Sequence, residues 1–74
     1  LPHNQRMVAR AVQSHCTRLG FPLASGIDGA WGAQTDAAIA KLVARHGDFY
    51  GLTAPTHSWP ARRAFAELLR TLPG

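Results

Sequence analysis

The fold of this chain depends most on the stretch GFPLASGIDGAWGA, residues 20–33. Its glycines and its proline are too closely spaced for a regular helix or strand. Solvent-exposed loops do not need apolar side chains such as Phe21, Ile27 and Trp31, so we expect a loop that folds back and packs these three on its neighbours. Asp28-Gly29 indicates a turn, because the carboxylate can accept from backbone N–H groups two residues on and glycine tolerates a positive φ.

The residues before this stretch predict an amphipathic helix from about Gln5 to Leu19. The apolar positions that would face the core recur at spacings of three and four: Val8, Val12, Cys16 and Leu19. Asn4 is suited to the N-cap, because its side chain can accept from a free backbone N–H of the first turn. Gly20 is expected to end the helix, since glycine takes the left-handed conformation without steric cost.

The residues after the stretch predict a second helix from about Ala33 to His46, with Gly47 as its stop. Its apolar stripe consists of Ala38, Ile39, Leu42 and Val43. Asp36 lies in the expected first turn, while basic residues lie near the end, which suits the helix dipole.

A third helix is predicted from Pro60 to about Leu72. Ser58 is suited to the N-cap, and Pro60 to the first turn, where its missing N–H has no cost. The residues expected to face inward are Phe65, Leu68, Leu69 and Leu72. The sequence therefore predicts an all-α fold, a small three-helix bundle with a long ordered Gly-rich loop between helices one and two.

Length and composition favour one small domain, residues 1–74, that is a module of a larger protein. Hydrophobic residues make up 46% of the chain, which is too apolar for a disordered tail. No apolar run is long enough to span a membrane, and no signal peptide is visible. The net charge of +4 favours anionic partners, although the basic residues are dispersed and fit solvated helix faces equally well.

Two segments together resemble the peptidoglycan-binding domain family, the three-helix cell-wall-binding module of bacterial and phage cell-wall hydrolases. The first part of that family's pattern is an apolar residue followed by Gln, then a further apolar pair, then Gly and an aromatic residue. The second part is a loop in which Asp-Gly is followed by two residues, Gly, two more residues and Thr. The residues that match the first part are Val12, Gln13, Cys16, Leu19, Gly20 and Phe21. Those that match the second are Asp28, Gly29, Trp31, Gly32, Thr35, Ala38 and Ile39. The resemblance covers residues 8–46.

The resemblance implies a non-catalytic module that binds peptidoglycan, through its glycan strand or stem peptide, and targets a linked hydrolase or effector to the wall. It implies an extracytoplasmic or cell-wall-associated location, whether periplasmic, secreted or phage-delivered. For such a groove we predict ligand contacts from Trp31, Gln34, Arg45 and Tyr50. The residues expected to build the scaffold are Gln13, Gly20, Asp28, Gly29, Gly32 and Thr35.

The scaffold residues have individual physical roles in this prediction. Asp28 would hold the turn through backbone amides, and Gly29 and Gly32 would allow a positive φ or a close backbone approach. Thr35, near the start of the second helix, would help to satisfy a free N–H. Trp31 would fill the space between the loop and the helices.

A second interpretation keeps the fold but not the ligand. Leu42-Val43 stand where the family usually has Phe-Gln, and the last helix is longer than the family's brief one. The chain could therefore be a protein-interaction module that has lost wall binding. This alternative predicts an exposed apolar strip on the third helix.

Other classes of function find little support. The acidic residues are taken up by the turn and by helix faces, so no paired general acid and base is expected, and the serines lack a triad context. The histidines show no metal-ligand spacing, and the lone Cys16 is expected to be a small buried hydrophobe. The connection over residues 20–33 is too long for a helix-turn-helix. We therefore predict a monomer that is not an enzyme, with no cofactor, no metal and no nucleic-acid partner.

Overall fold

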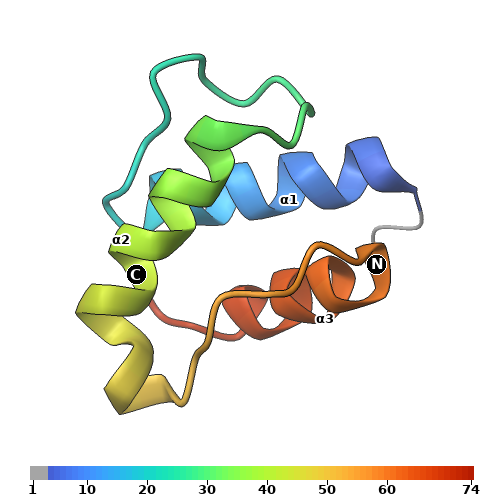
Figure 1. Cartoon of the computed structure of the whole chain (residues 1–74). Helices are drawn as coiled ribbons and strands as arrows, with labels where there is room; N and C mark the ends of the chain where they lie inside the picture. Colours follow the sequence, from blue (N-terminus) through green and yellow to red (C-terminus); the bar gives the residue numbers. More distant parts are fainter. Residues whose placement is uncertain (1–3) are drawn as a thin grey trace.

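Three helices form the described part of the chain, and Figure 1 shows their arrangement. The computed structural model describes residues 4–74. Helix α1 spans Gln5–Arg18, α2 spans Ala33–Tyr50 and α3 spans Trp59–Arg70, and no strand occurs within residues 4–74. Helix α1 packs against both α2 and α3. The all-α three-helix bundle predicted from the sequence is therefore confirmed.

The ends of α1 follow from the residues predicted there. The side chain of Asn4 accepts from the backbone N–H of Met7 at 2.9 Å, which caps the first turn. At the other end Gly20 has a φ of +99°, and the backbone N–H of Phe21 donates to Cys16 O at 2.8 Å. This left-handed glycine lets the chain turn back over the last carbonyls, so both expected boundaries are confirmed.

Helix α2 is longer than predicted, because Gly47 does not end it. Gly47 is buried inside the helix, where an added Cβ would lie 2.9 Å from the carbonyl oxygen of Leu52. The helix ends instead at Gly51, which has a φ of +68°, and the N–H of Leu52 donates to Gly47 O at 2.8 Å. Gly47 therefore allows a close approach of the following segment, and Gly51 supplies the left-handed residue.

Helix α3 begins one residue earlier than predicted, at Trp59, and Ser58 caps it by accepting from the N–H of Ala61 at 3.3 Å. The prediction that Leu68 faces inward is wrong, since 52% of it is exposed. Successive residues of a helix point about 100° apart, and the buried arc is centred on Phe65 and Leu69. Ala66 lies on the other side of that arc and is buried in place of Leu68.

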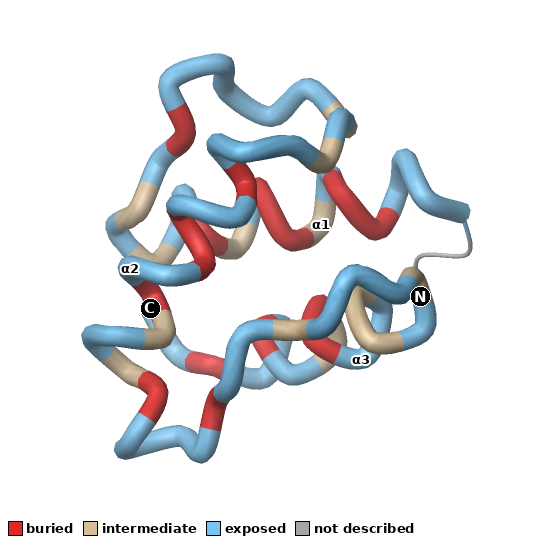
Figure 2. Tube along the Cα trace, viewed as in Figure 1, coloured by how far each residue is buried: buried red, intermediate tan, exposed pale blue. Residues whose placement is uncertain are grey.

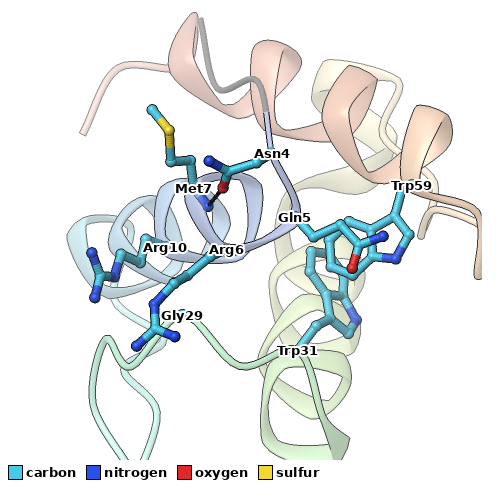
Figure 3. A pocket seen from close by; sticks show the side chains of 8 residues that line it. All are labelled: Asn4, Gln5, Arg6, Met7, Arg10, Gly29, Trp31 and Trp59. Carbon is cyan, nitrogen blue, oxygen red and sulfur yellow. Dashed lines mark hydrogen bonds between the residues drawn. The ribbon is translucent and has the colours of Figure 1, made fainter.

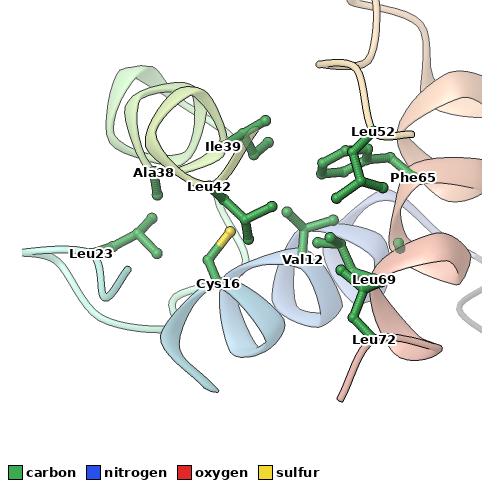
Figure 4. Packing of buried hydrophobic residues seen from close by; sticks show 11 residues of the cluster. Val12, Cys16, Leu23, Ala38, Ile39, Leu42, Leu52, Phe65, Leu69 and Leu72 are labelled. Atoms are coloured by element: carbon green, nitrogen blue, oxygen red, sulfur yellow. The ribbon is translucent and has the colours of Figure 1, made fainter. Parts of the chain in front are cut away.

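The core lies between α1 and the other two helices (Figures 2 and 4). Its buried members are Val12, Cys16, Leu23, Ala38, Ile39, Leu42, Leu52, Phe65, Ala66, Leu69 and Leu72. Each helix contributes to this cluster, and so do single residues of both connecting segments. The predicted inward positions on α1 and α2 are mostly confirmed, although Leu19 and Val43 are only partly buried against the cluster.

The loop between α1 and α2 packs two of its three predicted apolar side chains on the core. Phe21 and Trp31 are partly buried against the cluster, whereas 49% of Ile27 is exposed. The expectation for Ile27 is therefore wrong. The turn that follows Ile27 is held by polar contacts, described below, and these do not require Ile27 to be buried.

Candidate binding groove

One buried side-chain amide attaches the loop between α1 and α2 to α1. Gln13 is fully buried, and its Oε1 accepts from the backbone N–H of Gly29 at 2.9 Å. Its Nε2 lies 2.9 Å from Ala30 O, 3.0 Å from Asp28 Oδ1 and 3.1 Å from Thr35 Oγ1. An unpaired buried polar group costs about 1–3 kcal/mol, so these directional bonds fix the turn relative to α1.

Asp28 and Thr35 complete this network. Asp28 Oδ1 also accepts from the backbone N–H of Ala30 at 2.9 Å, which confirms the predicted tie to a backbone amide. The Ala30 amide, followed by the Gln13 side chain, lowers the pKa of the Asp28 carboxyl below its ordinary value. Thr35 is buried and donates from Oγ1 to Ala30 O at 3.4 Å. Its hydroxyl therefore closes the loop network, a role different from the helix capping expected of it.

Gly29 needs to be glycine for two reasons. Its φ is +77°, and an added Cβ would lie 2.9 Å from Cγ of Arg6 and 3.1 Å from Nε of Arg10. Two arginine side chains of α1 thus lie directly against this turn. Gly32 was also predicted to have a positive φ or a close backbone approach, and this prediction is wrong. Its φ is −141°, an added Cβ would have open space around it, and the residue serves as the N-cap of α2.

Trp31 connects the loop to α3 through an aromatic and cationic cluster. Its ring lies edge-to-face on Trp59, with centroids 5.8 Å apart. The guanidinium of Arg62 lies 4.4 Å from the Trp31 centroid and 4.5 Å from that of Trp59. Trp31 Nε1 donates to Asp36 Oδ1 at 2.9 Å, which fixes the orientation of the indole. Cation–π contacts of this kind contribute about 0.5–2 kcal/mol, so the two indoles form a fixed surface.

An open groove of about 780 Å³ lies between α1, the Gly29 turn and this cluster (Figure 3). It is lined by Asn4, Gln5, Arg6, Met7, Arg10, Gly29, Trp31 and Trp59. Figure 3 shows the two arginines on one side and the two indoles on the other. Indoles can stack on the apolar face of a flat or sugar ring, and guanidinium groups can donate to an oxyanion. The arrangement suits a ligand that carries both a ring with an apolar face and an oxyanion.

The four ligand contacts predicted from the sequence do not lie in one place. Trp31 lines the groove, whereas Gln34 lines a separate hollow of about 420 Å³, where its Oε1 accepts from the N–H of Ser25 at 2.8 Å. Arg45 and Tyr50 lie toward the far end of α2. Gln34 and Tyr50 are about 24 Å apart along the helix axis, at 1.5 Å per residue. One small ligand could not contact all four.

Sequence reasoning missed most residues of the groove. Arg6 and Arg10 are spaced like neighbours on one helix face, and this spacing was a usable signal. The only local signal for Trp59 was an aromatic residue directly before the helix-starting Pro60. Gln13 matched the family pattern, but its role as the centre of the network also follows from a polar residue inside an apolar helix stripe.

The remaining reactive side chains offer no obvious chemistry. Burial raises the pKa of the Cys16 thiol to about 11, so the thiol stays protonated and unreactive at neutral pH. Burial and the nearby Arg18 lower the pKa of His15. Within residues 4–74, no group of three or more His, Cys, Asp or Glu side chains is placed to hold a metal ion.

Comparison with protein-family models, with curated proteins and with solved structures finds no match to this chain. Among the helices of residues 4–74, none is both long and apolar enough to cross a membrane.

Proposed function

We propose that this protein is a non-catalytic cell-wall-binding module whose ligand is peptidoglycan. The observation that carries the proposal is the open groove in which Trp31 and Trp59 lie opposite Arg6 and Arg10. The pattern shared with the peptidoglycan-binding domain family supports it, because the matching residues Gln13 and Asp28 build the turn that borders this groove. The module would hold a linked hydrolase or effector at the wall.

The chemistry of the groove fits a glycan that carries peptides. Sugar rings present apolar C–H faces that stack on indoles, while polar groups at the rim select orientation. Binding to an immobile polymer raises the effective concentration of any linked domain without a chemical step. In this proposal the protein acts outside the cytoplasm or in the cell wall, and a partner protein or linked catalytic domain supplies the hydrolysis.

The proposal includes an ordered loop over residues 20–32 in the free protein. The bonds from Gln13 to this loop support it, because they leave its turn few alternative positions. Slow hydrogen exchange of the Gly29 amide, which donates to Gln13, is the expected result. Exchange at the rate of an unstructured peptide would contradict an ordered loop.

Cosedimentation with purified sacculi at moderate salt tests the function. We expect the wild-type protein to bind and Trp59→Leu to bind about fivefold more weakly, since loss of an aromatic contact costs about 1 kcal/mol. Leucine retains apolar volume but removes the flat ring. Helical circular dichroism of the variant should match that of the wild type.

Phe49→Leu is the matched control for Trp59→Leu. Phe49 is 84% exposed and does not line the groove, so the same kind of change is made elsewhere. We expect binding of Phe49→Leu to stay within about twofold of wild type, as for a surface position outside the contact. Absence of wild-type binding, or an equal loss in both variants, would contradict the proposal.

A second candidate function is a protein-interaction module on the same fold. The exposure of Leu68 favours it, because this leucine lines a shallow hollow of about 290 Å³ together with Ala64 and Pro55. An apolar hollow of this size fits a single apolar side chain of a partner protein.

Leu68→Gln separates the two candidates. If the interaction module is correct, sacculi do not retain the protein, and a purified partner loses affinity for Leu68→Gln but not for Trp59→Leu. If the wall-binding module is correct, Leu68→Gln binds sacculi as the wild type does, since Leu68 lies outside the groove.

A further inference from the structure

Arg6 and Arg10 form one side of the groove and lie one helical turn apart on α1. Their side chains pass so close to the turn that a Cβ on Gly29 would lie 2.9 Å from Arg6 Cγ and 3.3 Å from Arg10 Cγ. Figure 3 shows both side chains extending from α1 on the side away from the indoles, with Arg6 passing beside Gly29. The turn thus supports both stems and leaves the guanidinium groups at the surface.

In the described part of the chain, neither arginine has an acidic partner. Within residues 4–74, Arg70 pairs with Glu67, and no hydrogen bond or ion pair involves Arg6 or Arg10. The two acids of the loop region point to other donors: Asp28 accepts from the Ala30 amide and Asp36 from the Trp31 indole, and neither is bonded to Arg6 or Arg10. Among the described residues, therefore, no direct ion-pair partner faces the charge of Arg6 or Arg10.

Helix stability does not explain the pair. Like charges four residues apart on a helix repel each other. The first turn of a helix also disfavours cations, because the macrodipole is positive there, and the first turn of α1 contains Arg6 and no acidic residue. Both effects oppose folding and both are relieved by an anion bound between the two side chains.

We infer that Arg6 and Arg10 are the receptor for an oxyanion of the wall polymer, placed beside the sugar that stacks on Trp31 and Trp59. This inference rests on the proposed function and specifies its ligand. Guanidinium groups donate in a planar fork that matches a carboxylate or a phosphate. Stem peptides carry carboxylates, and anionic polymers attached to walls carry phosphates, so the shared chemistry is an oxyanion on a glycan-bearing polymer.

The test measures binding isotherms on three preparations of sacculi: native, carboxyl-amidated, and stripped of phosphate-bearing polymers. The double variant Arg6→Gln/Arg10→Gln should bind native sacculi about tenfold more weakly than wild type. The wild-type protein should also bind about tenfold more weakly to one of the two treated preparations, and should bind the other as it binds native sacculi. Loss on amidated sacculi assigns the oxyanion to a carboxylate, and loss on stripped sacculi assigns it to a phosphate.

Lys41→Gln/Arg45→Gln is the matched control, because it removes the same charge from exposed residues of α2 with the same spacing. It should bind within about twofold of wild type, as expected for charges that make no contact. Arg45, which the sequence predicted as a contact, lies outside the groove.

The outcomes separate the two proposals. If both double variants lose the same amount of binding, or if Arg6→Gln/Arg10→Gln loses none, the oxyanion receptor is overturned. If the wild type still binds sacculi in that case, the proposed function is retained. Equal wild-type binding to all three preparations also overturns the receptor. Failure of the wild type to bind any preparation overturns both.

Discussion

The two segments that connect the helices both bury a leucine in the core, but within residues 4–74 only the first is also bonded to a buried side-chain amide. Residues 20–32 place Leu23 in the core and are held in addition by polar groups, with Gln13 bonded to Asp28, Gly29 and Ala30. Residues 52–58 are attached through an apolar anchor, since Leu52 is 5% exposed and lies in the core. Hydrogen bonds depend on direction, whereas apolar burial depends mainly on area.

This difference has consequences at the surface. The polar attachment fixes the orientation of the turn, and with it the position of Gly29 under the two arginines of the groove. The apolar anchor fixes only one side chain, and the neighbouring Thr53 and Ala54 stay exposed. A binding surface that needs defined geometry is expected beside the first kind of connection.

Gln13→Leu should have the largest effect on stability. It leaves the Gly29 amide without its acceptor and removes the Gln13 bonds to Asp28, Ala30 and Thr35, at an expected cost of about 3 kcal/mol. Urea unfolding measures the change. Ser14→Ala, at an exposed neighbour on α1, should change stability by less than about 0.5 kcal/mol. A cost below about 1 kcal/mol for Gln13→Leu would mean that the loop is not held by polar bonds.

Leu52→Ala should cost about 2 kcal/mol, through lost burial and a cavity in the core. The two variants should differ in whether the loop over residues 20–32 opens locally or only when the whole protein unfolds. In Leu52→Ala, the Gly29 amide should exchange faster only by the factor that the lower free energy of global unfolding predicts. In Gln13→Leu the same amide should exchange faster than global unfolding allows. The same exchange pattern in both variants would remove the distinction between the connections.

Gly47→Ala should be destabilising by about 1 kcal/mol, although alanine is favoured over glycine in a helix by about that amount. The added Cβ would lie 2.9 Å from Leu52 O and 3.1 Å from Val43 Cγ1, so the apolar connection must shift. Thermal unfolding followed by circular dichroism measures this. An increase in Tm would show that the close approach imposes no constraint.

Asp28→Asn should have the smallest effect, and that effect should depend on pH. Hydrogen bonds from the Ala30 amide and Gln13 lower the pKa of Asp28 in the folded state, so the charged form stabilises the fold. This contribution is present above the unfolded-state pKa of about 3.9 and is lost as the pH falls through the lower folded-state pKa. The difference in stability between wild type and Asp28→Asn should therefore shrink between pH 7 and pH 3. A difference that stays constant would show that Asp28 is not bonded as described.

Local sequence determined the helices and most of their ends, because capping and periodicity act within a few residues. Asn4, Gly20 and Ser58 each function where their chemistry predicts. Asp28 likewise forms its predicted tie, since its partner Ala30 is only two residues away.

Tertiary structure decided the rest. Gly47 and Gly51 look alike in sequence, and only the approach of Leu52 assigns close packing to one and helix termination to the other. The exposure of Leu68 depends on which arc of α3 faces α1. The groove joins Arg6, Trp31 and Trp59, which are far apart along the chain, and no local pattern could have shown that packing on α1 brings them together.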